Sequence, residues 1–189
     1  MMDDLTLKLH EQLDWHWQAL ARPRLVGLSD EEYLWEPAPG TWSVRDRDQE
    51  SPASVTRRMG SGQWVFEYGH PEPDPAPVTS IAWRLAHVVV GVLGIRSANH
   101  FGGPAMSHDD WAFAGTAQEG LRQLDEAYAA WSAGVRALTP EALAAPVGPA
   151  EGDFAQEPML TLVLHINREV IHHLAEVALL RDLWAHGVR

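Results

Sequence analysis

Apolar side chains recur every three or four residues along four stretches of the chain. This is the spacing of amphipathic helices, which bury one face against a core. The pattern predicts helices over 4–21, from 79/80 to about 98, from 116 to about 138 and from about 159 to 184. Positions expected in their buried stripes are Leu5, Leu9, Leu13, Trp17 and Leu20 in the first helix, Leu121, Leu124, Tyr128, Trp131 and Val135 in the third, and Leu160, Val163, Val170, Leu174 and Val177 in the last.

Short polar motifs mark where several helices begin and end. Ser29–Glu32 and Thr116–Glu119 have the sequence of capping boxes, in which the first side chain accepts from free backbone amides and the glutamate reaches back. Thr139 followed by Pro140 predicts a further short helix, because proline is tolerated at the first helical position. Pro23 ends the first helix.

One segment, residues 49–78, lacks helical periodicity and is rich in proline and glycine. Within it, aromatic side chains occupy every second position from 64 to 68, which is the period of a β-strand. A disordered linker would be poorer in aromatic residues. We therefore expect an ordered flap containing half of a short hairpin.

Four long amphipathic helices, without convincing parallel-strand units, predict an all-α fold. We expect a four-helix bundle that carries one long decorated loop, at about 49–78. Because 189 residues is a common size for one domain, residues 1–189 are expected to form a single helical bundle domain.

The charge balance and the absence of cysteine exclude several functions. Twenty-six acidic residues against 14 basic ones give a formal charge of −12, which disfavours nucleic acid and anionic membrane surfaces as partners. Without cysteine there is no disulfide, no cysteine-ligated metal and no cysteine nucleophile. The N-terminus lacks the pattern of a signal peptide, and the longest apolar run, residues 88–95, is too short to cross a bilayer. We expect a soluble, cytoplasmic protein.

The last predicted helix carries the best candidates for metal ligands. Glu169 and His173 are four residues apart, so they lie one turn apart on the same side of the helix, as do His165 and Glu169. A carboxylate and an imidazole placed in this way can bind one cation. A third ligand must come from another helix, and His87, flanked by apolar residues, is the best candidate.

Each of these residues also has a simpler interpretation. His87 could be a hydrogen-bonded core histidine, because an unsatisfied buried polar group costs about 1–3 kcal/mol. His172 and His173 could be solvated, and Glu169 could pair with Arg168 or Lys8. The spacing of Glu169 and His172 is also that of di-metal carboxylate bundles, but these need a second such motif, which the chain lacks.

Three segments together resemble the DinB-like (YfiT-type) metal-binding four-helix bundles. They are Trp35–Val44, similar to the loop after the first helix of that family; Trp83–His87, similar to the second helix with its first histidine; and His165–Glu176, similar to the last helix. Many members carry three histidine ligands, whereas this chain has Glu169 at the middle position. A His–Glu–His set is similar to the mycothiol-dependent maleylpyruvate isomerase branch.

The resemblance implies a ligand set of His87, Glu169 and His173, with His172 as a neighbour and His165 beside the ligands or in the pocket. It also implies a divalent metal, zinc above all, with nickel, iron or manganese as alternatives. The second implied cofactor is a low-molecular-weight thiol such as mycothiol.

These features lead to three hypotheses. The first is a metal-dependent thiol S-transferase or isomerase acting on a small electrophile. The second is a metal-dependent hydrolase, with Glu176 or Asp14 as the base. The third is a non-enzymatic, stress-related metal-binding or interaction module. The expected partners are a small-molecule substrate and a thiol, with a homodimer as a further possibility and neither nucleic acid nor a membrane.

Two further groups were considered for the pocket. Arg84 lies nearly one turn before His87 and could bind a carboxylate substrate or the thiol cofactor, or could belong to a solvated helix face. Tryptophans 15, 17, 64 and 111 could line a substrate pocket, although aromatic residues at helical spacing are more often core.

Overall fold

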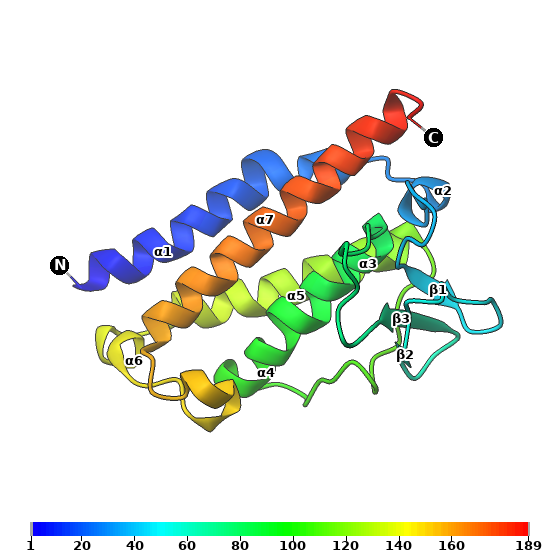
Figure 1. Cartoon of the computed structure of the whole chain (residues 1–189). Helices are drawn as coiled ribbons and strands as arrows, with labels where there is room; N and C mark the ends of the chain where they lie inside the picture. Colours follow the sequence, from blue (N-terminus) through cyan, green and yellow to red (C-terminus); the bar gives the residue numbers. More distant parts are fainter. Residues whose placement is uncertain (1, 189) are drawn as a thin grey trace.

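The computed structural model describes residues 2–188 and is mostly helical, with one small sheet (Figure 1). The α-helices are α1 (Met2–His16), α2 (Asp30–Tyr33), α3 (Ile81–Ala86), α4 (Ile95–Phe101), α5 (Ala117–Arg136), α6 (Pro140–Ala144) and α7 (Met159–Ala185). Between them lie the π-helices η1 (Trp17–Ala21) and η3 (His87–Gly94) and the 3₁₀-helices η2 (Pro23–Leu25) and η4 (Pro149–Phe154). The strands are β1 (Val44–Asp46), β2 (Arg57–Met59) and β3 (Trp64–Tyr68).

Four long helical segments form the body of the molecule. One of them is the run Ile81–Phe101, in which α3, η3 and α4 follow one another without a break. This run packs against α5 and α7, and both of these pack against α1 (Figure 1). Among the described residues, 81–101 is the one helix long and apolar enough to cross a membrane, but 61% of its most apolar window is buried inside the protein. Its hydrophobicity is therefore explained by its place in the core.

The predicted helix starts are confirmed by the cap contacts. Ser80 Oγ accepts from the Trp83 amide at 3.1 Å, and Thr116 Oγ1 accepts from the Glu119 amide at 3.3 Å. Ser29 caps α2 in the same way, but Glu32 does not complete a capping box. Its carboxylate instead accepts from Arg181 Nε at 2.7 Å, because α7 brings a cation to this point.

The predicted stripe of the first helix is correct for its middle and wrong at its two ends. Leu9, Leu13 and Trp17 are buried, whereas Leu5 and Leu20 are 39% and 47% exposed. Leu20 lies inside η1, where the wider π turn rotates side chains away from the regular 3.6-residue period. Leu5 lies near the projecting end of α1 (Figure 1).

The four tryptophans considered for a pocket have different surroundings. Trp17 is a core residue and stacks on Tyr128 with ring centroids 3.9 Å apart. Trp64 and Trp111 are partly buried against the same core. Trp15 is exposed, so it belongs neither to the core nor to a closed pocket.

The region 49–78 forms more β-structure than the sequence pattern predicts. The strand order is β1-β3-β2 with both pairings antiparallel, so the predicted strand, β3, is central and β2 and β3 form the expected hairpin. Phe66 faces Val44 on one side and Met59 on the other. This sheet lies beside α3 at one end of the helical body (Figure 1).

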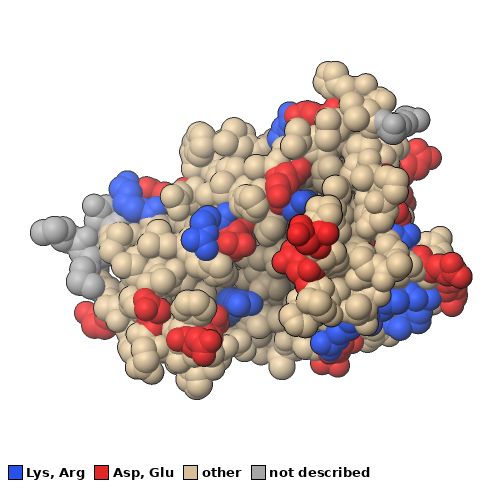
Figure 2. All heavy atoms as spheres, in the orientation of Figure 1, with Lys and Arg blue, Asp and Glu red and all other residues tan. Residues whose placement is uncertain are grey.

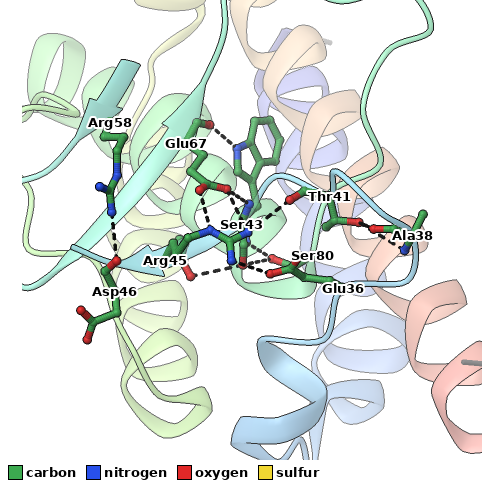
Figure 3. A network of polar contacts seen from close by, with 11 residues as sticks. Glu36, Ala38, Thr41, Ser43, Arg45, Asp46, Arg58, Glu67 and Ser80 are labelled. Atoms are coloured by element: carbon green, nitrogen blue, oxygen red, sulfur yellow. Dashed lines mark hydrogen bonds and ion pairs between the residues drawn. The ribbon is translucent and has the colours of Figure 1, made fainter. Parts of the chain in front are cut away.

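A buried acid ties the sheet to α3. Glu67 has no exposed surface, and its carboxylate accepts from the Ser43 amide at 2.8 Å and from Arg45 Nε at 2.6 Å (Figure 3). Arg45 also pairs with Glu36 at 2.7 Å. The Glu67 carbonyl accepts from Trp83 Nε1 at 2.7 Å, which connects β3 directly to α3.

Candidate metal centre

The structure brings the three proposed ligands together. Glu169 and His173 lie one turn apart on α7, and His87, the first residue of η3, reaches them from the neighbouring helix. One ligand atom from each residue lies within 4.8 Å of the other two. His173 Nε2 and Glu169 Oε2 are 3.6 Å apart. Two ligands of one tetrahedral zinc ion are about 3.4 Å apart, so these residues fit a metal after small side-chain adjustments.

The position of His87 depends on the sheet as well as on its own helix. Its ring stacks on Trp83 with centroids 5.4 Å apart and an interplanar angle of 17°. Trp83 is held by its hydrogen bond to the Glu67 carbonyl of β3. The ring of His87 then meets that of His173 edge-on at 4.7 Å. The 49–78 region therefore supports the candidate centre through Trp83.

Glu176 determines which nitrogen of His173 faces the other ligands. His173 Nδ1 donates to Glu176 Oε2 at 2.8 Å, because a carboxylate can only accept. The lone pair of Nε2 is then free on the side of Glu169 and His87. Arg84 pairs with the same oxygen of Glu176, so Arg84, Glu176 and His173 form a chain of contacts. Carboxylates that hold ligating histidines in this way are common at metal sites.

Burial keeps His87 in the neutral form that a metal requires. Burial lowers the pKa of His87 to about 3, with smaller contributions from His173, His108 and the two arginines Arg84 and Arg96. A neutral imidazole has a lone pair available for a cation at neutral pH. The core-histidine interpretation also predicts burial, but it does not account for Glu169 and His173 lying opposite the ring.

His108 lies beside the centre and was not found from the sequence. A Cβ built on Gly91 would lie 3.1 Å from His87 Nδ1 and 3.5 Å from His108 Nε2, so both nitrogens face the same small space. The ring of His108 also packs on Phe66, with centroids 5.4 Å apart, and burial lowers its pKa. His108 comes from the irregular segment after α4, where no periodic pattern indicates which way a side chain points.

The other histidines of α7 lie at the edge of the centre. His165 Nδ1 is 3.7 Å from Glu169 Oε1 and accepts from Arg168 Nη2 at 2.6 Å. His172 is exposed, and its Nε2 is 3.4 Å from Glu176 Oε1. His172, His173 and Glu176 thus form a second, more exposed group that could hold a metal. This group shares His173 with the first one, and Arg84 already provides a cation for its carboxylate.

Two further candidates have partners that define their surroundings. Arg84 is mostly buried and pairs with Glu176, so the solvated-face interpretation is wrong: α7 covers this side of α3. Asp14, considered as a base, accepts from Tyr128 at 2.8 Å, in a contact between α1 and α5. It belongs to neither candidate metal group of the described residues.

Comparison with protein families agrees with this geometry. The family model of the DinB superfamily matches residues 52–177, two-thirds of the 189 residues. The chain belongs to the DinB superfamily. The match includes His87, Glu169 and His173, and DinB proteins commonly bind a divalent metal. Searches of curated proteins and of solved structures found no match.

Proposed function

We propose that this DinB-superfamily protein is a four-helix bundle that binds one divalent metal ion through His87, Glu169 and His173. The observation that supports this most directly is the convergence of two imidazoles and a carboxylate from two helices within 4.8 Å. Two nitrogen ligands and one oxygen ligand suit zinc, nickel, iron or manganese, with zinc the first expectation. Three protein ligands leave a coordination position open, which is the arrangement of catalytic sites.

We propose further that the centre serves a thiol S-transferase or isomerase reaction with a small electrophile. When bound, the metal supplies positive charge that favours the thiolate over the thiol. In the transfer reaction the thiol proton passes to solvent, the sulfur bonds to the electrophilic carbon, and the leaving group departs with its electron pair. Addition to an activated alkene, rotation and elimination of the same thiol would give an isomerase. The chain has no cysteine, so the sulfur comes from a thiol such as mycothiol.

The residues of this chain would hold the reacting centre in one geometry. His87, Glu169 and His173 bind the metal, and Glu176 keeps Nδ1 of His173 protonated. Arg84 pairs with Glu176 and holds its carboxylate in place, so Glu176 has less freedom to act as a base. This arrangement favours the thiol reaction over the hydrolase alternative, in which Glu176 would have to accept a proton from water.

Metal content tests the ligand set first. Protein purified without chelators should contain one metal ion per chain, and His87→Ala and Glu169→Ala should each lose it. His186→Ala is the matched control, because His186 lies beyond the end of α7 and should leave the metal content unchanged. Normal metal in both ligand variants would contradict the site. A wild-type chain without metal, which also takes up none from added zinc, would favour the non-enzymatic module.

A thiol panel then tests the reaction. Metal-loaded protein should convert halogenated or unsaturated electrophiles only when a low-molecular-weight thiol is present. Hydrolysis that never depends on added thiol would favour the hydrolase instead.

Cytoplasmic location and the absence of a nucleic-acid partner are part of the proposal. The absence of a nucleic-acid partner is supported by the −12 charge and by the acidic residues that lie among Lys and Arg on the face drawn in Figure 2.

A further inference from the structure

A cavity lies next to the proposed metal centre, between the end of the 81–101 run, the 147–157 segment and the first half of α7. Its volume is about 630 Å³, within the range of sites for small molecules. The face drawn in Figure 2 is hollowed near its centre, where Figure 1 shows α7 beside the 81–101 run. Its lining includes Arg96, Glu151, Phe154, Leu164, His165 and Arg168.

The cavity and the metal centre share one wall. His165 and Arg168 line the cavity, and both contact Glu169, the proposed carboxylate ligand. The distances to Glu169 Oε1 are 3.7 Å from His165 Nδ1 and 3.4 Å from Arg168 Nη2. A molecule in the cavity would therefore be separated from Glu169 by the side chains of His165 and Arg168.

The apolar part of the wall is accessible. Phe154 is 70% exposed and Leu164 is 48% exposed, and both line the cavity. Large apolar side chains brought together around a concave surface are typical of ligand sites. They would pack against the hydrocarbon part of a ligand.

The α7 side of the cavity favours a carboxylate over an ammonium group, because it carries Arg168, whereas the two acids of the lining, Glu151 and Glu157, belong to the 147–157 segment. Glu151 accepts from His100 Nε2 at 2.9 Å and lies 3.6 Å from Arg96 Nε, so this acid already has two basic neighbours. Arg168 Nη2 donates to His165 Nδ1 at 2.6 Å, and its contact with Glu169 Oε1 is longer, at 3.4 Å. The guanidinium has five N–H groups, so those not directed at His165 remain for an anion in the cavity. The guanidinium can then donate two parallel hydrogen bonds to a carboxylate.

We propose that this cavity binds a small carboxylic acid with an apolar body. Its carboxylate pairs with Arg168, and its hydrocarbon part packs against Phe154 and Leu164. Its role as the electrophilic substrate rests on the proposed metal-dependent function, whereas the binding itself is measurable without turnover.

The test compares cinnamate with cinnamamide, which has the same shape and no charge. Calorimetry on zinc-loaded protein should show that Arg168→Gln weakens cinnamate binding about tenfold and leaves cinnamamide binding unchanged. Phe154→Ala should weaken both ligands by the same factor, because it removes only apolar contact. Arg122→Gln, on the exposed surface of α5, is the matched control and should alter neither.

The outcomes separate this inference from the proposed function. The cavity proposal is overturned, and the metal site left intact, if zinc-loaded protein binds cinnamate no more tightly than cinnamamide. The same conclusion follows if the wild type and Arg168→Gln bind cinnamate equally well. Cinnamate binding that requires zinc but not Arg168 also overturns it, because the carboxylate then binds the metal directly. If the chain takes up no zinc, the proposed function fails. Cinnamate binding to the metal-free chain that is lost in Arg168→Gln would still support the cavity.

Discussion

Two acid–base clusters lie on opposite sides of the Trp83–His87 stack, and they differ in how fully their charges are matched. In the sheet, Glu67 is fully buried and accepts from the Ser43 amide at 2.8 Å and from Arg45 at 2.6 Å. On α7, the Glu169 side chain is 26% exposed, and its basic neighbours lie at 3.4 to 3.7 Å. The carboxylate of Glu67 is fully paired, whereas among the described residues Glu169 has no partner closer than 3.4 Å.

This difference distinguishes a structural ion pair from an ion-binding site. A buried carboxylate that already has a cation and an amide has little to gain from an added metal, and losing either partner is costly. A partly exposed carboxylate facing two imidazoles has lone pairs available at little cost. Both clusters contain acid and base groups from distant parts of the sequence, so residue types alone do not separate them. The two clusters are instead distinguished by how close and how complete the pairing of their charges is.

Breaking the sheet cluster should have the largest effect on stability. Arg45→Met leaves the buried carboxylate of Glu67 without its cation, which costs about 3–5 kcal/mol in comparable pairs. Urea denaturation should show this loss, and the double variant Arg45→Met/Glu67→Gln should recover part of it. A single variant as stable as the wild type would show that the Glu67 network is not a structural ion pair.

Acid should destabilise the metal-free protein through His87. Its folded pKa is lowered to about 3 from 6.5, by burial first and then by His173, His108, Arg84 and Arg96. Between these values the unfolded chain binds the extra proton, so stability is present at pH 7 and is lost as pH falls from about 6.5 towards 3. The expected slope is roughly 1 kcal/mol per pH unit. The denaturation midpoint, measured in chelator between pH 7 and 4, should fall less steeply with falling pH for His87→Gln than for the wild type. Equal slopes would contradict the assignment of this pH dependence to His87.

Removing the carboxylate of Glu169 should affect metal binding and not stability, the reverse of what is expected for Arg45→Met. Glu169→Gln should leave the metal-free protein about as stable as the wild type, because its contacts are long and partly exposed. Its zinc affinity, measured by competition with a chromophoric chelator, should fall more than about a hundredfold, since even outer partners of metal ligands cost 10–100-fold. If Glu169→Gln were strongly destabilised and bound zinc as tightly as the wild type, the α7 cluster would be a structural ion pair and not an ion-binding site.

Local signals in the sequence predicted a large part of this arrangement. Caps such as Ser80 and Thr116 depend on contacts three residues apart, and both are confirmed. The four-residue spacing of Glu169 and His173 follows from helix geometry in the same way. The contact of these residues with His87 is not local: the apolar residues around His87 made it a candidate, and the resemblance to a family assigned it to the ligand set.

The features that the sequence did not predict depend on long-range packing. β1 and β2 are three-residue strands that acquire their structure by pairing with β3. Glu67 occupied a position in an alternating pattern, and nothing in that pattern indicated Arg45 as its partner. His108 lies beside Gly91 and His87 through a contact between a loop and a helix face, which no local pattern indicates. The exposure of Leu20 follows from a π turn that a regular period does not reveal.

Glu176 should give the smallest and most selective of these effects. It touches His173 but is not among the proposed ligands, so Glu176→Gln removes the charge that orients the imidazole and keeps the side chain's size. Zinc affinity should fall about 10–100-fold. The metal-free unfolding midpoint should fall only modestly, because the pair with Arg84 is partly exposed and the Gln oxygen can still accept from the guanidinium. The absorption spectrum of the cobalt-substituted protein should also change, because the geometry around the metal depends on His173. Glu126→Gln, an exposed acid on α5, is the matched control. If both variants bind zinc equally well, then the contact of Glu176 with His173 is only structural, and the two clusters differ less than their geometry suggests.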